Sequence, residues 1–214
     1  EHSLPLEVSY ESWQTKGWIY LYEESEVEVV SLRVIAMTEH HIVHKDKHHR
    51  FESQRLFENA LEIAKRLQAK RVTAYFAPTL DLADNPFDRA LDTFAAFGEM
   101  AQSLELKIDI MPSPPKSAPL FSSAEDVQNL LAALNNEELF GLRLNDQNLG
   151  KVETFFSQWK NGLAHLQLSE PKEKPPLSKW WEILGNQPQI ISVLCPQFDE
   201  ANSTAELVDE LRAT

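Results

Sequence analysis

The segment FGLRLNDQNL, residues 140–149, joins an apolar run to a polar corner. Its first half has the pattern of a buried strand, and that strand ends in Asn-Asp-Gln-Asn. In α/β proteins, ligands bind just beyond the carboxyl ends of such strands. The segment therefore indicates an α/β fold with a candidate site at this corner. Its amides, however, stand where a metal site would need carboxylates and imidazoles.

Further segments are nearly continuous apolar runs, as expected for strands that helices cover on both faces or wrap into a barrel. Segments of helical period lie between them, including 51–68, 85–104 with Asn85 as the N-cap, and 122–134. This alternation predicts parallel βαβ units. The predicted strands are 31–37, 71–77, 106–111, 140–145, 163–168 and 190–195.

Two more strand candidates, residues 6–13 and 17–24, precede this regular part of the chain. They bring the count to eight, which predicts a TIM (β/α)8 barrel. A parallel crossover needs about a dozen residues, and the gaps here are shorter. Either these strands form an antiparallel meander or the sequence lacks residues between them, and we favour the second explanation. An open doubly wound sheet is the alternative fold, but the chain has no G-x-G-x-x-G motif.

Composition narrows the classes of protein. The 214 residues suit one domain spanning 1–214, and the net charge of −13 disfavours binding to nucleic acid or to an anionic membrane. No apolar run approaches the roughly 18 residues of a membrane-spanning helix. The single cysteine, Cys195, cannot form an internal disulfide, so we expect a cytoplasmic protein.

The strand ends carry motifs in a recognisable order, of which AHLQLSE (164–170) and GLRLNDQN (141–148) are the best matches. In this order and spacing the sequence resembles the xylose-isomerase-like TIM barrels. That sugar isomerase/epimerase superfamily also includes the endonuclease IV type of apurinic endonuclease. The resemblance extends over roughly residues 31–200. It implies an α/β TIM barrel with a divalent metal site at the strand ends.

The departures from the family pattern concern the metal ligands that the resemblance implies. The family's glutamate, aspartate, histidine and glutamate positions are occupied by other residues, and a further family histidine is replaced by Asn148. Methionine and leucine offer nothing to a hard cation, and amides offer only neutral carbonyls. We therefore expect no metal and no other cofactor. The four positions are Met111, Asn145, Gln167 and Leu194 (or Cys195 if the register shifts by one).

Polar residues at the same strand ends remain suitable for a small polyol or a sugar phosphate, because amides and carboxylates hydrogen-bond to hydroxyls. We expect Asn145, Asn148, His165, Gln167 and Glu170 to bind this ligand at the carboxyl-end mouth of the barrel. Any remaining acid–base chemistry would use His165 with Glu170 or Asp146. The predicted function is that of an isomerase/epimerase homologue with a degenerate metal site. The alternative is a non-catalytic interaction or regulatory protein that keeps only the scaffold.

A histidine-rich segment, TEHHIVHKDKHH (38–49), follows one of the predicted strands. His40 and His44, or His44 and His48, have the i, i+4 spacing that can share one metal if the segment is helical. An active metal enzyme that uses these histidines is therefore a third hypothesis. The competing interpretation, which we favour, is a solvated polar loop.

Overall fold

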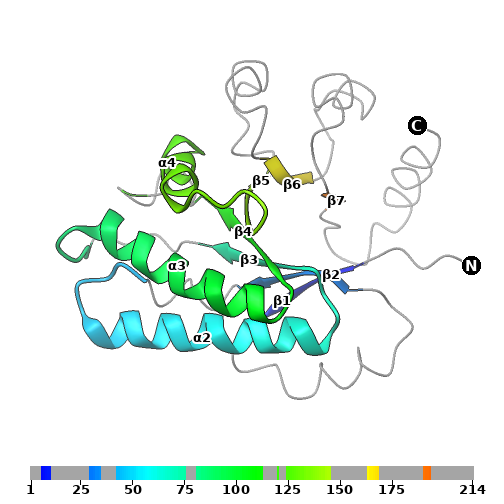
Figure 1. The fold of residues 1–214 in the computed structure, drawn as a ribbon, viewed down its shortest axis with the longest axis horizontal. Coiled ribbons are helices and arrows are strands. Elements are labelled where there is room, and N and C mark those ends of the chain that lie inside the picture. Colours follow the sequence, from blue (N-terminus) through cyan, green and yellow to red (C-terminus); the bar gives the residue numbers. More distant parts are fainter. Residues whose placement is uncertain are drawn as a thin grey trace, which may run out of the picture. The chain divides into compact units, whose positions relative to one another are not determined.

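The structure is a computed structural model that describes residues 6–10, 29–34, 42–75, 81–112, 120, 124–145, 163–168 and 190–193. The chain divides into two compact units, Glu1–Leu142 and Arg143–Thr214. Figure 1 shows the helices and strands of the described residues.

The first unit is built on parallel strands that lie side by side in chain order. Each strand pairs with the next one, without any reversal of order. A doubly wound sheet reverses its strand order near the middle, whereas a TIM barrel does not. The strands are β1 (Leu6–Tyr10), β2 (Val29–Val34), β3 (Arg71–Tyr75), β4 (Lys107–Met111) and β5 (Phe140–Asn145), the last of which crosses the boundary between the units.

The pairing of β1 with β2 corrects the prediction for the N-terminal residues. The two strands are parallel and hydrogen-bonded neighbours, so no strand from 17–24 lies between them in the sheet, and the antiparallel meander is wrong. The 18 residues from 11 to 28 exceed the dozen that a parallel crossover needs, so no missing residues are required. The strand predicted at 17–24 lies outside the described residues.

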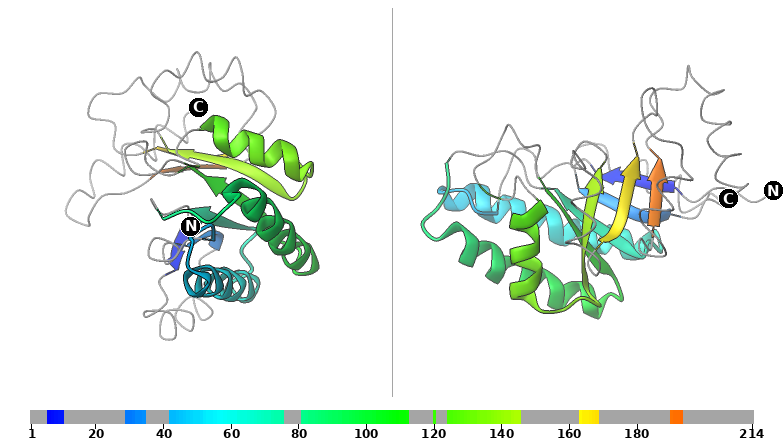
Figure 2. Two further views of the ribbon diagram at one scale, coloured as in Figure 1. Left: turned by 90° about the vertical axis from the view of Figure 1, so that its left-hand side faces the viewer. Right: turned by 90° about the horizontal axis from the view of Figure 1, so that it is seen from above.

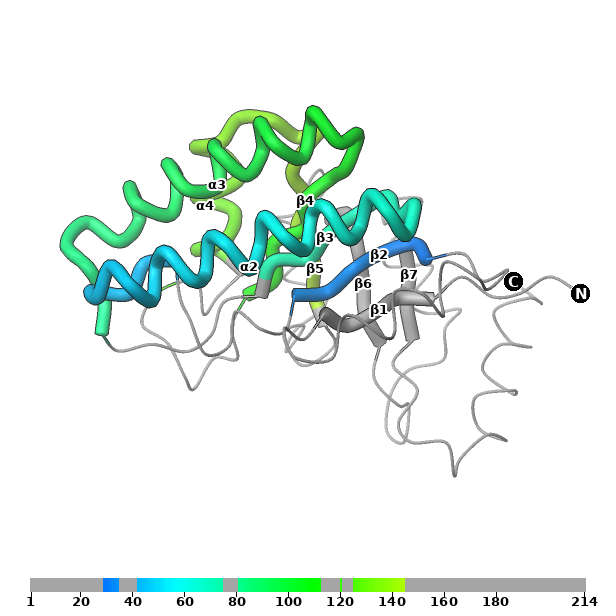
Figure 3. The backbone as a smooth tube through the Cα atoms, turned by 90° about the horizontal axis from the view of Figure 1, so that it is seen from below, coloured from blue at the N-terminus to red at the C-terminus, as the bar shows by residue number. Residues whose placement is uncertain are grey.

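The helices that the structure describes in the first unit lie on one side of the strands: α2 (Lys47–Arg66), α3 (Pro86–Ser103) and α4 (Ala124–Leu134). The helix α2 packs against β2 and β3, while α3 lies between α2 and α4 and packs against β4 (Figures 2 and 3). Asn85 precedes α3, as predicted, but its side chain makes no capping hydrogen bond because its backbone is left-handed (φ 51°).

The apolar face of the sheet is turned toward these helices. Leu32, Val72, Ile108 and Phe140 are cross-strand neighbours, and all four are buried. Phe140 contacts α3, where its ring lies 6.5 Å from that of Phe94. Rings from α2 and α3 complete the cluster, with the centroids of Phe57 and Phe97 4.4 Å apart.

The opposite face of the same strands is polar. Ser31, Arg33, Arg71, Thr73 and Asp109 alternate with the apolar residues, and we call these five side chains the inner polar face. Inward-facing residues of a TIM barrel are usually bulky and apolar. The description of these strands as continuous apolar runs was therefore wrong for this face.

A buried ion pair crosses the inner polar face. Nη1 of Arg71 donates to Oδ1 of Asp109 at 2.5 Å, and the two side chains are 6% and 0% exposed. Arg71 pairs in register with Lys107, two residues before Asp109, so the ion pair runs diagonally from β3 to β4. The pair therefore ties two neighbouring strands together through side chains as well as backbone.

The second unit contains the parallel pair β6 (Leu163–Leu168) and β7 (Ile190–Val193). Both strands match the predicted segments, and β6 has the predicted bounds. Within the described ranges, no helix is long and apolar enough to cross a membrane.

We expect Gly98→Ala to destabilise the protein by about 1–3 kcal/mol through overpacking. A Cβ at this buried helical position would stand 2.7 Å from Cζ of Phe140 and 3.0 Å from a methyl carbon of Leu139. Urea unfolding measures the change. In a double-mutant cycle, Gly98→Ala should lower the free energy of unfolding less in a Phe140→Leu background than in the unaltered protein. Strictly additive losses would contradict the proposed clash.

Removing one member of the buried ion pair should lower the free energy of unfolding more than removing both members. Arg71→Met leaves the Asp109 carboxylate buried without its guanidinium, for which we expect a loss of about 3–5 kcal/mol. Arg71→Met combined with Asp109→Leu should lose less, because no buried charge remains on either strand. Equal losses for the single and double variants, measured by urea unfolding, would refute this account.

Candidate functional site

Two of the residues singled out in the sequence lie at the carboxyl ends of β4 and β5. Met111 is the last residue of β4 and is buried, and Asn145 is the last residue of β5. The two residues thus occupy strand ends, as the family resemblance implies. Asp146 and Asn148 follow Asn145 and lie outside the described residues.

His165 and Gln167 both belong to β6. They are two residues apart along the strand. Their register partners on β7 are Ile190 and Ser192. Glu170, Leu194 and Cys195 lie outside the described residues.

Met111, Asn145 and Gln167 are the described residues at three of the four positions where the family resemblance places metal ligands. Met111 supplies a thioether, while Asn145 and Gln167 supply neutral amide oxygens, and none of them offsets a double positive charge. In the part of the chain that the structure describes, no group of three or more His, Cys, Asp or Glu side chains could hold a metal.

The described part of the histidine-rich segment, residues 42–49, is helical only from Lys47 onward. The helix α2 begins at Lys47, so His44 precedes it and the i, i+4 geometry proposed for His44 and His48 is wrong. Instead, Nδ1 of His44 accepts a hydrogen bond from the backbone N–H of Asp46 at 3.0 Å. The ring of His44 lies 4.4 Å from that of His49. The described histidines therefore give no support to a relocated metal site.

Asp46 caps the amino end of α2. Its Oδ1 accepts a hydrogen bond from the backbone N–H of His48 at 2.8 Å, and this bond lowers the pKa of the Asp46 carboxyl group. The neighbouring histidines lower this pKa further by Coulomb attraction. The carboxylate therefore caps the helix, and its negative charge also interacts favourably with the helix dipole.

The loops that precede α2 and α3 are joined to each other. The backbone N–H of Lys45 donates to the carbonyl of Asp81 at 2.7 Å, and that of Ala83 donates to the carbonyl of Val43 at 2.8 Å. Nζ of Lys45 also lies 2.6 Å from Oδ1 of Asp81, and this contact lowers the pKa of the Asp81 carboxyl group. These loops follow β2 and β3, so the bridge connects two segments on the carboxyl-end side of the sheet.

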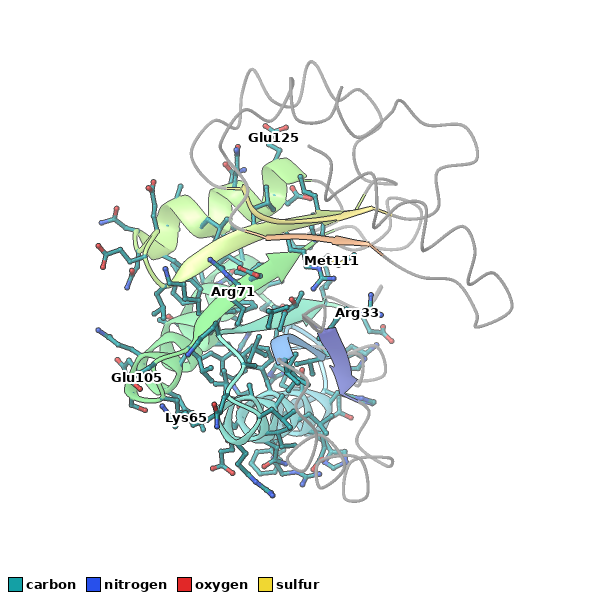
Figure 4. The ribbon with its side chains drawn as sticks, turned by 90° about the vertical axis from the view of Figure 1, so that its right-hand side faces the viewer. Arg33, Lys65, Arg71, Glu105, Met111 and Glu125 are labelled. Carbon is teal, nitrogen blue, oxygen red and sulfur yellow. The ribbon has the colours of Figure 1, made fainter. Side chains whose placement is uncertain are left out.

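The inner polar face lies below the same strand ends. Figure 4 shows Arg33 and Met111 toward the end of the sheet to which the arrow of β4 points, with Arg71 farther from that end. On β5, Arg143 continues the alternation and is fully buried. These residues were not among the predicted site residues. The alternation of polar and apolar residues in RVTAY (71–75) and KIDIM (107–111) is the sequence feature that identifies such positions.

No family model matches the sequence, and no curated protein matches it. Solved structures do resemble the fold. A D-tagatose 3-epimerase-like protein is 17% identical with a TM-score of 0.75, covering 97% of this chain and 88% of its own. An L-ribulose 3-epimerase is 12% identical with a TM-score of 0.76, covering 97% and 81%.

The IolI protein with a zinc atom is also similar, at 12% identity and a TM-score of 0.72, covering 97% of this chain and 86% of its own. At these identities the likeness concerns the fold. Together with the parallel strands in chain order and the helices packed against them, it shows that the chain has an α/β TIM-barrel fold like that of these structures.

Proposed function

We propose that this protein is a sugar or sugar-phosphate isomerase/epimerase homologue with a degenerate metal site. It binds a small polyhydroxy ligand at the carboxyl-end mouth of the barrel. The single barrel domain comprises residues 1–214, and the lone cysteine favours a cytoplasmic setting. The likeness to epimerase structures over 97% of the chain supports the class of ligand.

The inner polar face is the observation that carries this proposal. A barrel kept only as a scaffold needs a packed interior, which apolar side chains fill best. Here Thr73 and Asp109 are fully buried, and Arg33 is partly exposed beside them. Polar side chains on this face depart from the usual apolar interior and are compatible with a ligand rich in hydroxyl groups.

The ligand contacts that we propose come from the strand ends. Asn145, Asn148, His165, Gln167 and Glu170 offer donors and acceptors that match sugar hydroxyls. Each amide can donate and accept at once, so the set tolerates different hydroxyl orientations. The site therefore selects for polyols without requiring a cation.

Acid–base chemistry on such a ligand would fall to His165 with Glu170 or Asp146. Removing a proton beside a sugar carbonyl creates negative charge on the carbonyl oxygen, which a metal stabilises in metal-dependent enzymes. Amides at Asn145 and Gln167 stabilise that charge only through hydrogen bonds. We therefore propose ligand binding as the primary activity, with slow proton exchange as its only chemistry.

If the protein binds such a ligand, we expect some neutral or phosphorylated ketoses to raise its thermal stability. A ligand at 100 times its dissociation constant should add about 2.7 kcal/mol to the free energy of unfolding. Asn145→Ala should weaken this binding about tenfold, because one pair of hydrogen bonds is lost. Differential scanning fluorimetry and calorimetric titration measure both effects.

The matched control is Asn129→Ala on the exposed surface of α4, which should leave the binding unchanged. If no ketose or ketose phosphate in the panel stabilises the protein, the proposed ligand class is wrong. That outcome would favour the alternative, a scaffold that serves protein interactions.

Restoring family ligands should restore metal affinity. Asn145→Asp combined with Gln167→His supplies a carboxylate and an imidazole, so we expect at least about a tenfold gain in affinity for Mn²⁺ or Zn²⁺. Elemental analysis of protein purified without chelators and metal titration by calorimetry give the readout.

The control for metal binding carries the same two changes on exposed helical positions, Asn129→Asp and Gln102→His. It should show no gain. Stoichiometric metal in the unaltered protein would overturn the degenerate site, and an unchanged affinity in the restored variant would show that the family register used here is wrong.

A further inference from the structure

We infer that protonation of His44 breaks the hydrogen bond that orders the loop before α2, and that this loosens the two joined loops of the first unit. The joined loops are residues 43–46 and 81–84, which precede α2 and α3 on the carboxyl-end side of β2 and β3. The inference is one of regulation by pH. It does not depend on which ligand the protein binds.

His44 lies at the centre of the joined loops. Its backbone forms an isolated antiparallel bridge with Leu82, and its chain neighbours Val43 and Lys45 carry the backbone hydrogen bonds that join the loops. Nη1 of Arg50 donates to the carbonyl of His44 at 2.6 Å and to that of Lys45 at 2.7 Å. A change in the conformation of His44 therefore reaches both loops.

The side-chain hydrogen bond of His44 requires an unprotonated ring nitrogen. Nδ1 accepts from the backbone N–H of Asp46 at 3.0 Å, so Nδ1 must present its lone pair. In a protonated imidazole both nitrogens are donors, and two N–H groups would then face each other. Imidazole ordinarily takes up its proton near about pH 6.5. This bond is therefore present in neutral solution and lost on acidification.

The charged groups around His44 come from its own loop, from α2 and from the second loop. The carboxylates of Asp46 and Asp81 attract a positive charge on the ring. The ring can therefore take up a proton beside these carboxylates, whereas the Asp46 amide loses its acceptor. Among the described residues, the groups that oppose a positive charge here are Lys45, His48, Arg50 and His49, whose ring lies 4.4 Å away.

The two carboxylates do not change their charge over the same range of pH. The pKa of the Asp46 carboxyl group is lowered, first by the hydrogen bond from the backbone N–H of His48. The pKa of the Asp81 carboxyl group is lowered by the hydrogen bond from Nζ of Lys45. Both groups therefore stay ionised from about pH 5 to about pH 7.5. The cap of α2 and the ion pair between the loops persist there, while histidine side chains change charge.

Amide hydrogen exchange of the full chain, followed by NMR at about pH 7.5 and about pH 5, tests the inference. Each rate is divided by the intrinsic rate at the same pH. We expect the protection of the Asp46, Lys45 and Ala83 amides to fall about three- to tenfold on acidification, as the loss of one hydrogen bond implies. The fall should have the same midpoint as the His44 ring, whose nitrogens long-range proton–nitrogen spectra observe directly.

His44→Asn is the variant that separates the hydrogen bond from the titration. The Oδ1 of asparagine accepts a hydrogen bond from the amide two residues later, and it does not titrate. The protection of the three amides should therefore stay at its neutral value down to about pH 5. The matched control is His48→Gln on the exposed first turn of α2, which should keep the full response to pH.

Three results would each overturn the inference. They are equal protection of the three amides at both pH values in the unaltered protein, a midpoint that differs from that of the His44 ring, and a full response in His44→Asn. The first two need no variant, so the test stands if His44→Asn does not fold. A failure of every ketose to bind would overturn the proposed function and leave this inference intact.

Discussion

The diagonal ion pair between Arg71 and Asp109 determines which residues of β3 and β4 face the helices and which face away from them. Two opposite charges in a place that is almost closed to water are tolerated only as partners, so each fixes the position of the other. The pair also requires that odd-numbered residues of β3 and β4 face away from the helices. That requirement leaves the even-numbered residues to form the apolar contact with α2 and α3.

Much of the fold follows from periodicity in the sequence. The strands 140–145 and 163–168 were predicted with their observed bounds, because apolar runs flanked by helical segments leave little ambiguity. The N-terminal strands were harder to predict. Residues 17–24 have strand-like composition, and only the pairing of β1 with β2 shows that they do not lie between those strands.

The site could be predicted in part. Strand-end positions such as Asn145 follow from strand bounds, since the carboxyl end of a parallel strand is a local property. The inner polar face was not predicted, because the strands were described as continuous apolar runs although polar and apolar residues alternate in 71–75 and 107–111. Which of these polar residues become neighbours depends on register between strands that are 30 or more residues apart, which a single sequence does not specify.

The hydrogen bonds that join the loops before α2 and α3 restrict how these loops can move. Backbone hydrogen bonds in both directions, reinforced by Lys45 and Asp81, couple the two loops mechanically. Neither loop can swing aside without breaking these bonds or carrying the other along. The described parts of the two loops, residues 43–46 and 81–84, should therefore move together as one unit.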